Sequence, residues 1–174
     1  MSTKDAGRSN VHTRRNLAEF TGTDPYAPKV DPGNVLLCTQ CQAIYQRRHW
    51  FFDAEAYFHF DMQPDTIKGL CPACQKIRDR YADGQVVLHA SPFLTAHKDE
   101  ILRLIHNEET RAKGLNPLER LIEVSESDAG ITVTTTTEKL AQRIGRAVKS
   151  AYQGETTYRW SDPKYLSVEW QRAE

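Results

Sequence analysis

The sequence predicts an α+β protein in which a small cysteine-rich module precedes a split β-α-β (ferredoxin-like) sandwich with one extra strand. Two Cys-x-x-Cys pairs lie in the first half of the chain, separated by 29 residues, and this pattern is typical of a small metal-stapled module. After residue 84 the hydrophobic period alternates between that of strands and that of helices. A chain of 174 residues is long enough for both parts.

The composition changes twice along the chain and indicates three parts. Residues 1–34 are rich in Gly, Ser, Thr, Asn, Asp and Pro and show no hydrophobic period, which predicts a disordered tail. Residues 35–84 contain all four cysteines. Residues 85–174 carry the strand and helix patterns, so we expect them to form the α+β domain.

Few elements can be predicted within the module. Residues 35–37 are apolar and predict a short strand before the first cysteine pair. Residues 75–81 predict a short polar helix that stops near Gly84. The stretch between the pairs is rich in aromatic residues at 49–60, and we expect it to fold back as a hairpin or loop.

The α+β domain is predicted to follow the order β-α-β-β-α-β-β. Pro92 stands where the first helix begins, and Gly114 stands where it ends. Thr137 is a suitable cap for the second helix, and Gly154 follows its last turn. The expected elements are strand 85–90, helix 92–114, strands 119–125 and 131–136, helix 138–152, and strands 156–160 and 165–170.

The two cysteine pairs predict a single structural zinc site. Two residues between the cysteines of a pair let both thiolates reach one ion, and two pairs complete a closed tetrahedral shell without a position for substrate or water. Metal binding then contributes folding free energy to a segment that is too small to form its own core. Residues 35–84 are therefore predicted to be a zinc ribbon. The predicted ligands are Cys38, Cys41, Cys71 and Cys74.

Other interpretations of the cysteines stay open. The spacing also resembles that of rubredoxins, which hold one iron for electron transfer. Rubredoxins normally have Gly after the second cysteine of each pair, whereas this chain has Gln42 and Gln75. A redox dithiol is a further alternative. His49 or His59 could replace one cysteine ligand, although surface or packing roles are expected for both histidines.

One face of the second predicted helix is a candidate RNA-binding surface. At about 100° per residue, Lys139, Arg143 and Arg146 share one face of helix 138–152, and apolar residues occupy the opposite face. The threonine run 134–137 places hydroxyl and free N–H groups at the positive end of that helix, where a phosphate can bind. The alternative interpretation is an ordinary solvated face.

A second candidate RNA-binding surface lies in the module. Arg47, Arg48 and Trp50 place cations beside aromatic rings, as expected of a segment that holds phosphates and stacks unpaired bases. Lys76, Arg78 and Arg80 could extend this basic surface, although Asp79 lies among them. The alternative is that the aromatic side chains form the small core of the module and the arginines lie outside it.

The composition argues against several classes of function. Lys plus Arg and Asp plus Glu are equal, 23 each, and the pI is about 7.0, so a nucleic-acid site must come from local clustering. The mean hydropathy is −0.63 and no long apolar run occurs, so no membrane association is expected. Without a recognisable secretory signal, we expect a cytoplasmic location. No catalytic motif is recognisable, so we expect no enzymatic activity.

The cysteine pairs and the segment 134–146 together resemble a known family. They are similar to the N-terminal zinc-ribbon and following α+β region of the large-ribosomal-subunit export adaptor family, in its archaeal-type members. The likeness covers residues 35–174 and implies zinc at the four cysteines, a similar structural unit at 134–146, and attachment to ribosomal RNA or a ribosomal subunit. The family usually has more cysteines and further domains. The sequence also resembles short bacterial zinc-ribbon proteins of unassigned function.

These observations lead to one main functional prediction and two alternatives. The main prediction is a non-enzymatic protein with one Zn²⁺ ion that associates with ribosomal RNA or a ribosomal subunit. The first alternative is a zinc-ribbon adaptor that binds a protein partner in transcription or stress response. The second is a rubredoxin-like iron electron carrier. The sequence leaves the oligomeric state open.

Overall fold

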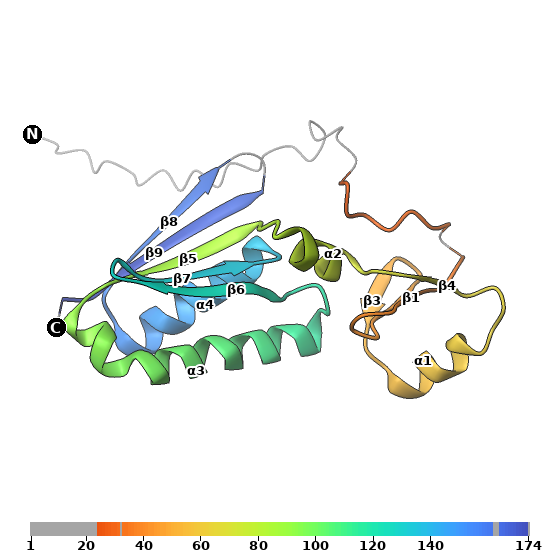
Figure 1. Cartoon of the computed structure of the whole chain (residues 1–174), viewed down its shortest axis with the longest axis horizontal. Helices are drawn as coiled ribbons and strands as arrows, with labels where there is room; N and C mark the ends of the chain where they lie inside the picture. Colours follow the sequence, from red (N-terminus) through yellow and green to blue (C-terminus); the bar gives the residue numbers. More distant parts are fainter. Residues whose placement is uncertain (1–23, 32, 162–163, 174) are drawn as a thin grey trace, which may run out of the picture.

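The computed structural model of the protein describes residues 24–31, 33–161 and 164–173. These residues form an α+β structure with two mixed sheets and four helices (Figure 1). The tail predicted for residues 1–34 lies outside the described part as far as residue 23. Residues 24–31 make contacts that the sequence did not predict: the rings of Tyr26 and Tyr81 lie 5.2 Å apart, and Val30 packs against the smaller hydrophobic cluster.

The first sheet, with its two helices, forms what we call the module. Its strand order is β3-β2-β1-β4, and β1 pairs antiparallel with β2 but parallel with β4. The sequence predicted only the first strand and the last helix of this part, because three-residue strands are too short to show a period. The elements are β1 (Leu36–Cys38), β2 (Ile44–Gln46), β3 (His49–Phe51), α1 (Ala54–Asp61), β4 (Ile67–Gly69) and α2 (Pro72–Asp79).

The second sheet and the helices on it form what we call the sandwich. All seven elements occur in the predicted order, with ends that differ from the predicted ones by at most two residues. They are β5 (Gly84–His89), α3 (Pro92–Leu115), β6 (Leu121–Ser127), β7 (Gly130–Thr135), α4 (Glu138–Tyr152), β8 (Glu155–Ser161) and β9 (Tyr165–Gln171). Among the described residues, no helix combines the length and the apolar composition needed to cross a bilayer.

The extra strand changes the pairing at the centre of the second sheet. The strand order is β6-β7-β5-β9-β8, so β9 rather than β8 lies beside β5 and runs parallel to it. In a ferredoxin-like sheet, by contrast, the strand that follows the second helix pairs antiparallel with the first strand. The reason lies in the side chains, because β9 buries every second residue, whereas β8 has none that is buried. The strand with the apolar face takes the central position, and the polar strand forms the edge.

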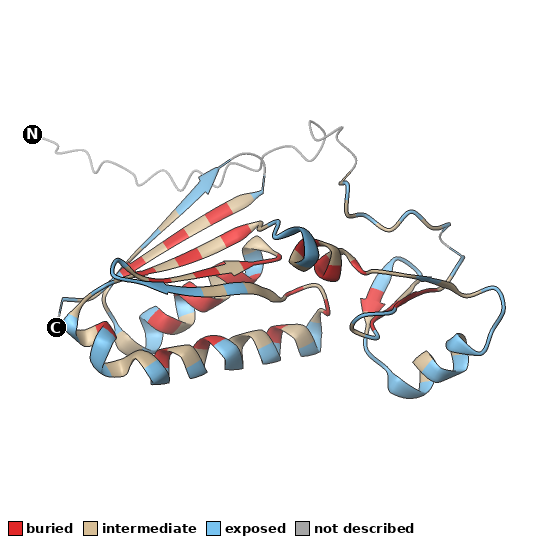
Figure 2. Cartoon of the chain, in the orientation of Figure 1, coloured by how far each residue is buried: buried red, intermediate tan, exposed pale blue. Residues whose placement is uncertain are grey.

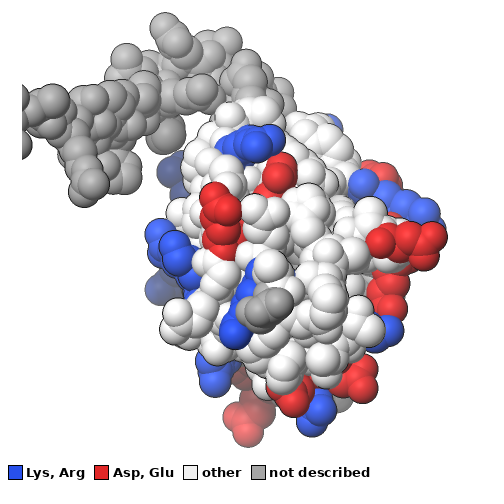
Figure 3. Space-filling model, turned by 90° about the vertical axis from the view of Figure 1, so that its left-hand side faces the viewer, with Lys and Arg blue, Asp and Glu red and all other residues white. Residues whose placement is uncertain are grey.

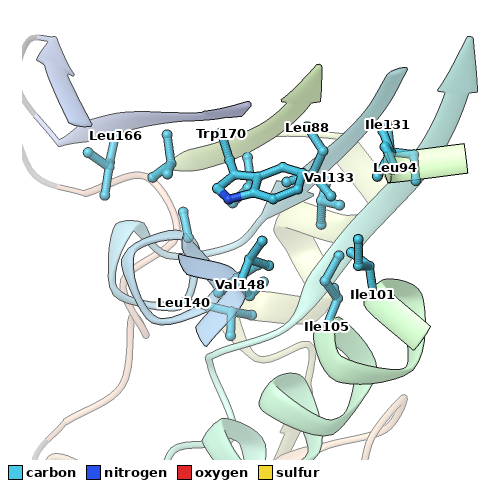
Figure 4. Close-up of a cluster of buried hydrophobic side chains, with 14 of the residues drawn as sticks. Leu88, Leu94, Ile101, Ile105, Ile131, Val133, Leu140, Val148, Leu166 and Trp170 are labelled. Atoms are coloured by element: carbon cyan, nitrogen blue, oxygen red, sulfur yellow. The ribbon is translucent and has the colours of Figure 1, made fainter. Parts of the chain in front are cut away.

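The core of the sandwich lies between the sheet and the two helices α3 and α4. Both helices cover the same face of the sheet (Figure 1), and buried residues recur along the central strands and the two helices (Figure 2). Trp170 on β9 is fully buried, and its indole Nε1 donates a 2.6 Å hydrogen bond to the carbonyl of Gln153. Figure 4 labels Trp170 and other members of the same buried cluster: Leu88, Leu94, Ile101, Ile105, Ile131, Val133, Leu140, Val148 and Leu166.

Helix α4 approaches the sheet most closely at Gly145. A Cβ atom at this position would lie 2.6 Å from Cγ1 of Val168 and 3.3 Å from the hydroxyl of Tyr158. Both distances are shorter than an ordinary van der Waals contact. The absence of a side chain therefore lets α4 pack directly on β9.

Helix α2 joins the module to the sandwich. Lys76 is 8% exposed, and its Nζ lies 2.7 Å from Oδ2 of Asp83 and 3.2 Å from the carbonyl oxygen of Thr136. Asp83 directly precedes β5, and Thr136 lies between β7 and α4. A buried, charge-assisted hydrogen bond of this kind fixes the position of α2 against the sandwich.

Candidate metal centre and cationic hollows

The first cysteine pair lies in a tight turn between β1 and β2. Cys38 is the last residue of β1, and its backbone N–H donates to the carbonyl of Ala43 at 2.8 Å. Gln42 donates its backbone N–H to the carbonyl of Cys38 at 3.0 Å and has a left-handed φ of 63°. This closed turn brings Cys41 back toward Cys38.

The second cysteine pair lies at the start of a helix. Cys71 is the N-cap of α2, and its sulfur accepts a hydrogen bond from the backbone N–H of Cys74 at 3.4 Å. Pro72 occupies the first turn, where no backbone donor is needed. A helix N-terminus carries partial positive charge, which by itself stabilises a thiolate at this position. The structure thus uses a turn for the first pair and a helix N-terminus for the second, and α2 begins three residues before the predicted helix 75–81.

The four cysteine sulfurs converge on one point. They all lie within 4.8 Å of one another, and the sulfurs of Cys41 and Cys71 are 3.7 Å apart. The parallel pairing of β1 with β4 places Cys38 opposite Gly69, two residues before the second pair. All four cysteines are free, and a disulfide would require about 2.05 Å. Metal–sulfur bonds of about 2.3 Å in a tetrahedral shell require sulfurs roughly 3.8 Å apart, so this cluster fits a metal ion.

The thiol groups of this cluster share protons. Hydrogen bonds from Cys41 and Cys71 hold the pKa of Cys38 far below its usual range. The Cys38 sulfur in turn raises the pKa of both Cys71 and Cys74. Cys38 also raises the pKa of Cys41, but hydrogen bonds from Cys71 and Cys74 outweigh this effect and lower it to about 7. Full deprotonation therefore needs a cation to replace the protons, and acid opposes metal binding.

Neither candidate histidine belongs to the cysteine cluster. His49 is exposed, and its ring stacks at 6.3 Å on that of Phe51. His59 is also exposed, and its Nε2 lies 2.8 Å from the side-chain amide of Gln63. Within the described residues, only the four cysteines form a group that could hold a metal ion.

The three cations predicted on the second helix line a hollow on the surface of α4. Lys139 and Arg146 are exposed, and Arg143 is partly buried. The hollow has a volume of about 610 Å³, and we call it the α4 hollow. Its lining residues are Glu108, Glu119, Lys139, Gln142, Arg143, Arg146 and Ala147.

The arginines predicted in the module lie at the turn between β2 and β3. Arg47 and Arg48 are both exposed and have left-handed φ angles of 51° and 65°. Arg48 and Lys139 line one hollow of about 360 Å³ between the module and the start of α4, which we call the junction hollow. The structure thus brings together two candidate surfaces that lie far apart in the sequence. Asp24, Asp83 and Glu138 also line the junction hollow.

Two of the residues assigned to a basic or stacking surface lie inside the protein. Trp50 is 6% exposed and packs beside Tyr45, with ring centroids 5.1 Å apart. This position supports the alternative that Trp50 belongs to the core of the module. Lys76 is likewise buried in its pair with Asp83 and does not extend an exposed basic surface. Sequence patterns could not reveal either position, because burial depends on residues that are distant in the chain.

The threonine run before α4 serves structure rather than an open phosphate site. Thr135 and Thr136 are fully buried, and their hydroxyls donate to the backbone carbonyls of Thr137 and Leu118. Thr137 caps α4 as predicted and accepts from the backbone N–H of Leu140 at 3.3 Å. Thr136 and Thr137 also line the junction hollow, beside Glu138 and Lys139 at the start of α4, but the Thr136 hydroxyl already donates its hydrogen to the Leu118 carbonyl.

The distribution of charge elsewhere does not favour a bulk interaction with polyanions. On the end of the molecule that carries β8 and the C-terminus, Lys and Arg side chains are interspersed with Asp and Glu (Figure 3). The equal totals of both signs lead to the same conclusion.

Comparison with known proteins adds no family to these observations. No protein-family model matches the chain, and no curated protein sequence matches it significantly. The function must be argued from the cysteine cluster and the two hollows.

Proposed function

We propose that this chain is a non-enzymatic zinc protein that binds RNA along the junction hollow and the α4 hollow. Zinc is the ion that four thiolates in a closed tetrahedral shell suit best. The cytoplasm, where thiols stay reduced, is the compartment that fits this donor set. The metal holds the module together and takes no part in a reaction, because four sulfurs leave no open coordination position.

Elemental analysis of the purified protein tests the choice of metal. We expect one zinc per chain and no visible absorption, because zinc has a filled d shell. A rubredoxin-like protein would instead be coloured and contain iron. Stoichiometric iron after purification from iron- and zinc-replete cells would contradict the proposal.

One observation supports RNA binding above the others: Lys139 lines both hollows. Arg48 lies at one end of the resulting track, and Arg143 and Arg146 lie at the other. Cations spaced along a groove can contact successive phosphates of a single strand. The family resemblance of the cysteine pairs and residues 134–146 supplies the partner class, ribosomal RNA or a ribosomal subunit.

A binding titration with single-stranded RNA at several salt concentrations tests this track. Replacing Lys139, Arg143 and Arg146 by Ala should weaken binding at least about 10-fold and reduce the salt slope by about 2, at roughly 0.7 per lost phosphate contact. The matched control replaces Arg78, Lys98 and Arg159, three paired cations that line neither hollow. Equal affinity and salt slope in the two triple variants would contradict the proposed track. Sedimentation of the wild-type protein with ribosomal subunits then tests the partner class.

A protein-binding adaptor is the second candidate function, and helix α1 favours it. This helix has no buried residue, and Phe58 and the adjoining Met62 are 74% and 84% exposed. Exposed apolar side chains one turn apart are typical of a helix that contacts a partner. Affinity purification after nuclease treatment separates the two functions. A protein partner recovered from wild type, and lost when Phe58 and Met62 become Ser, would support the adaptor.

A further inference from the structure

The α4 hollow contains a buried carboxylate beside its three cations. Glu119 is 6% exposed and lies in the loop between α3 and β6. One of its carboxylate oxygens, Oε2, is fully enclosed and has no hydrogen-bond partner among the described residues. A hollow built only for phosphate would have no use for a buried negative group, since it repels the ligand.

The cation nearest to Glu119 does not satisfy this oxygen. Nε of Arg143 lies 4.0 Å from Oε2 of Glu119, which is beyond hydrogen-bond distance. By contrast, the neighbouring ion pair on α3 is within hydrogen-bond distance, with Nη1 of Arg111 2.8 Å from Oε1 of Glu108. The Arg143 side chain is also 37% exposed, so it can turn toward a ligand without being pulled from the core.

The backbone around Glu119 is held in place by Thr136. The hydroxyl of Thr136 donates to the carbonyl of Leu118 at 2.6 Å and accepts from the backbone N–H of Arg120 at 2.8 Å. Both residues that flank Glu119 are therefore bound to one buried side chain. The backbone N–H of Glu119 also donates to the carbonyl of Asn116 at 3.0 Å. This support fixes the carboxylate at the hollow before any ligand arrives.

We propose that the α4 hollow binds a guanine base of unpaired RNA: Arg143 turns from Glu119 toward a phosphate and uncovers Oε2, both carboxylate oxygens of Glu119 then accept hydrogen bonds from the base, and Arg146 holds an adjacent phosphate. The inference rests on the proposed RNA-binding function. An ionised carboxylate only accepts hydrogen bonds, and guanine presents two adjacent donors, N1–H and the N2 amino group, on its Watson–Crick edge. Adenine, cytosine and uracil each place acceptors beside a single donor group, so they leave lone pairs facing the carboxylate.

Short RNA probes test this preference without altering the protein. Labelled uridine heptamers with a central G, A, C or U are titrated against the full-length zinc-loaded protein. We expect the G probe to bind about 10-fold more tightly than the others. Inosine in place of guanine, which removes the N2 amino group, should abolish the preference, whereas 7-deazaguanine, which keeps both donors, should retain it. Equal binding of all probes would overturn the guanine inference and leave RNA binding intact. Failure of every probe would overturn the proposed function itself.

A pair of protein variants then assigns the contact to Glu119. Glu119→Gln offers one acceptor and one donor group, so it cannot accept both guanine donors, and the G preference should fall to about 2-fold or less. Glu123→Gln removes an exposed carboxylate outside the hollow and should keep the preference. Unchanged melting and zinc content verify that both variants fold. A Glu119→Gln protein that still prefers the G probe would overturn the role of Glu119. If Glu119→Gln does not fold, the comparison of the guanine and inosine probes on the wild-type protein still tests the base preference.

Discussion

The module and the sandwich lie in one chain but are held together by different forces. The sandwich buries fifteen residues in one hydrophobic cluster, and Trp170 and several branched aliphatic side chains are among them. The cluster of the module contains seven buried residues, and three of these are the cysteines Cys38, Cys71 and Cys74. Without a bound cation, the centre of the module therefore contains charged or unsatisfied sulfur atoms, whereas every residue of the sandwich cluster is hydrophobic.

This difference shows how a short segment can be made rigid enough to position a side chain. Each strand of the module has three residues, and α1 contributes no buried residue. Hydrophobic burial on this scale cannot offset the conformational entropy of about fifty residues. We propose that a metal ion held by the four cysteines contributes the missing free energy. The junction hollow then depends on both parts, because Arg48 comes from the module and Lys139 from the sandwich.

Removing one metal ligand should have the largest effect and should separate the two regions. In Cys71→Ser the module should lose its metal and unfold, since structural zinc contributes about 10–16 kcal/mol in isolated zinc-finger peptides. The sandwich should keep its structure. Hydrogen exchange followed by mass spectrometry should show loss of protection in 36–79 and retained protection in 84–171. Thr39→Ser, a change within the same turn, is the control. Stoichiometric metal in Cys71→Ser would show that this sulfur is not a ligand.

The converse change removes the largest side chain from the sandwich core. Trp170→Ala should lower the free energy of unfolding by about 3–5 kcal/mol, because it leaves a cavity and removes the hydrogen bond to Gln153. Zinc content should stay at one per chain. Trp160→Ala is the matched control, since Trp160 is 52% exposed and its loss should cost about 0.5 kcal/mol or less. Similar urea denaturation midpoints for the two variants would contradict the assignment of Trp170 to the core.

The smallest change in the free energy of unfolding is expected at the ion pair between Lys76 and Asp83, which links the two regions. Lys76→Met leaves Asp83 and the carbonyl of Thr136 without their shared donor and should cost about 1–3 kcal/mol. The matched control is Lys68→Met, which breaks a solvent-exposed pair with Asp61 within the module and should change stability little. Thermal unfolding of both variants, with and without chelator, measures the coupling. If Lys76→Met behaves like Lys68→Met, the two regions are not joined through this contact.

Sequence patterns predicted the sandwich better than the module for a physical reason. Strands of six or seven residues and helices of fifteen or more show a hydrophobic period that depends only on local geometry. The three-residue strands β2, β3 and β4 show no such period. The position of β9 between β5 and β8 was also unpredicted, because the choice between neighbouring strands depends on which one buries its alternate residues.

The candidate sites also differ in how well the sequence predicted them. Two Cys-x-x-Cys pairs predict a shared metal ion from spacing alone, and the structure brings all four sulfurs together. Exposure is not encoded by local spacing, so Trp50 and Lys76 were assigned to a surface although both are buried. Glu119 gave no sequence signal at all. Only its burial beside the cations of α4 distinguishes it from other surface glutamates.

By itself, the sequence predicted the cluster of four cysteines and the order of strands and helices in the sandwich, because the spacing within each pair and the hydrophobic period are local features of the chain. Only the tertiary structure decided that Arg48 and Lys139 line one hollow and that Nε of Arg143 lies 4.0 Å from Oε2 of Glu119. It also gave the reason for glycine at position 145, where α4 contacts β9. These features arise when segments distant in sequence pack together, and packing distances of a few ångströms cannot be read from local periodicity.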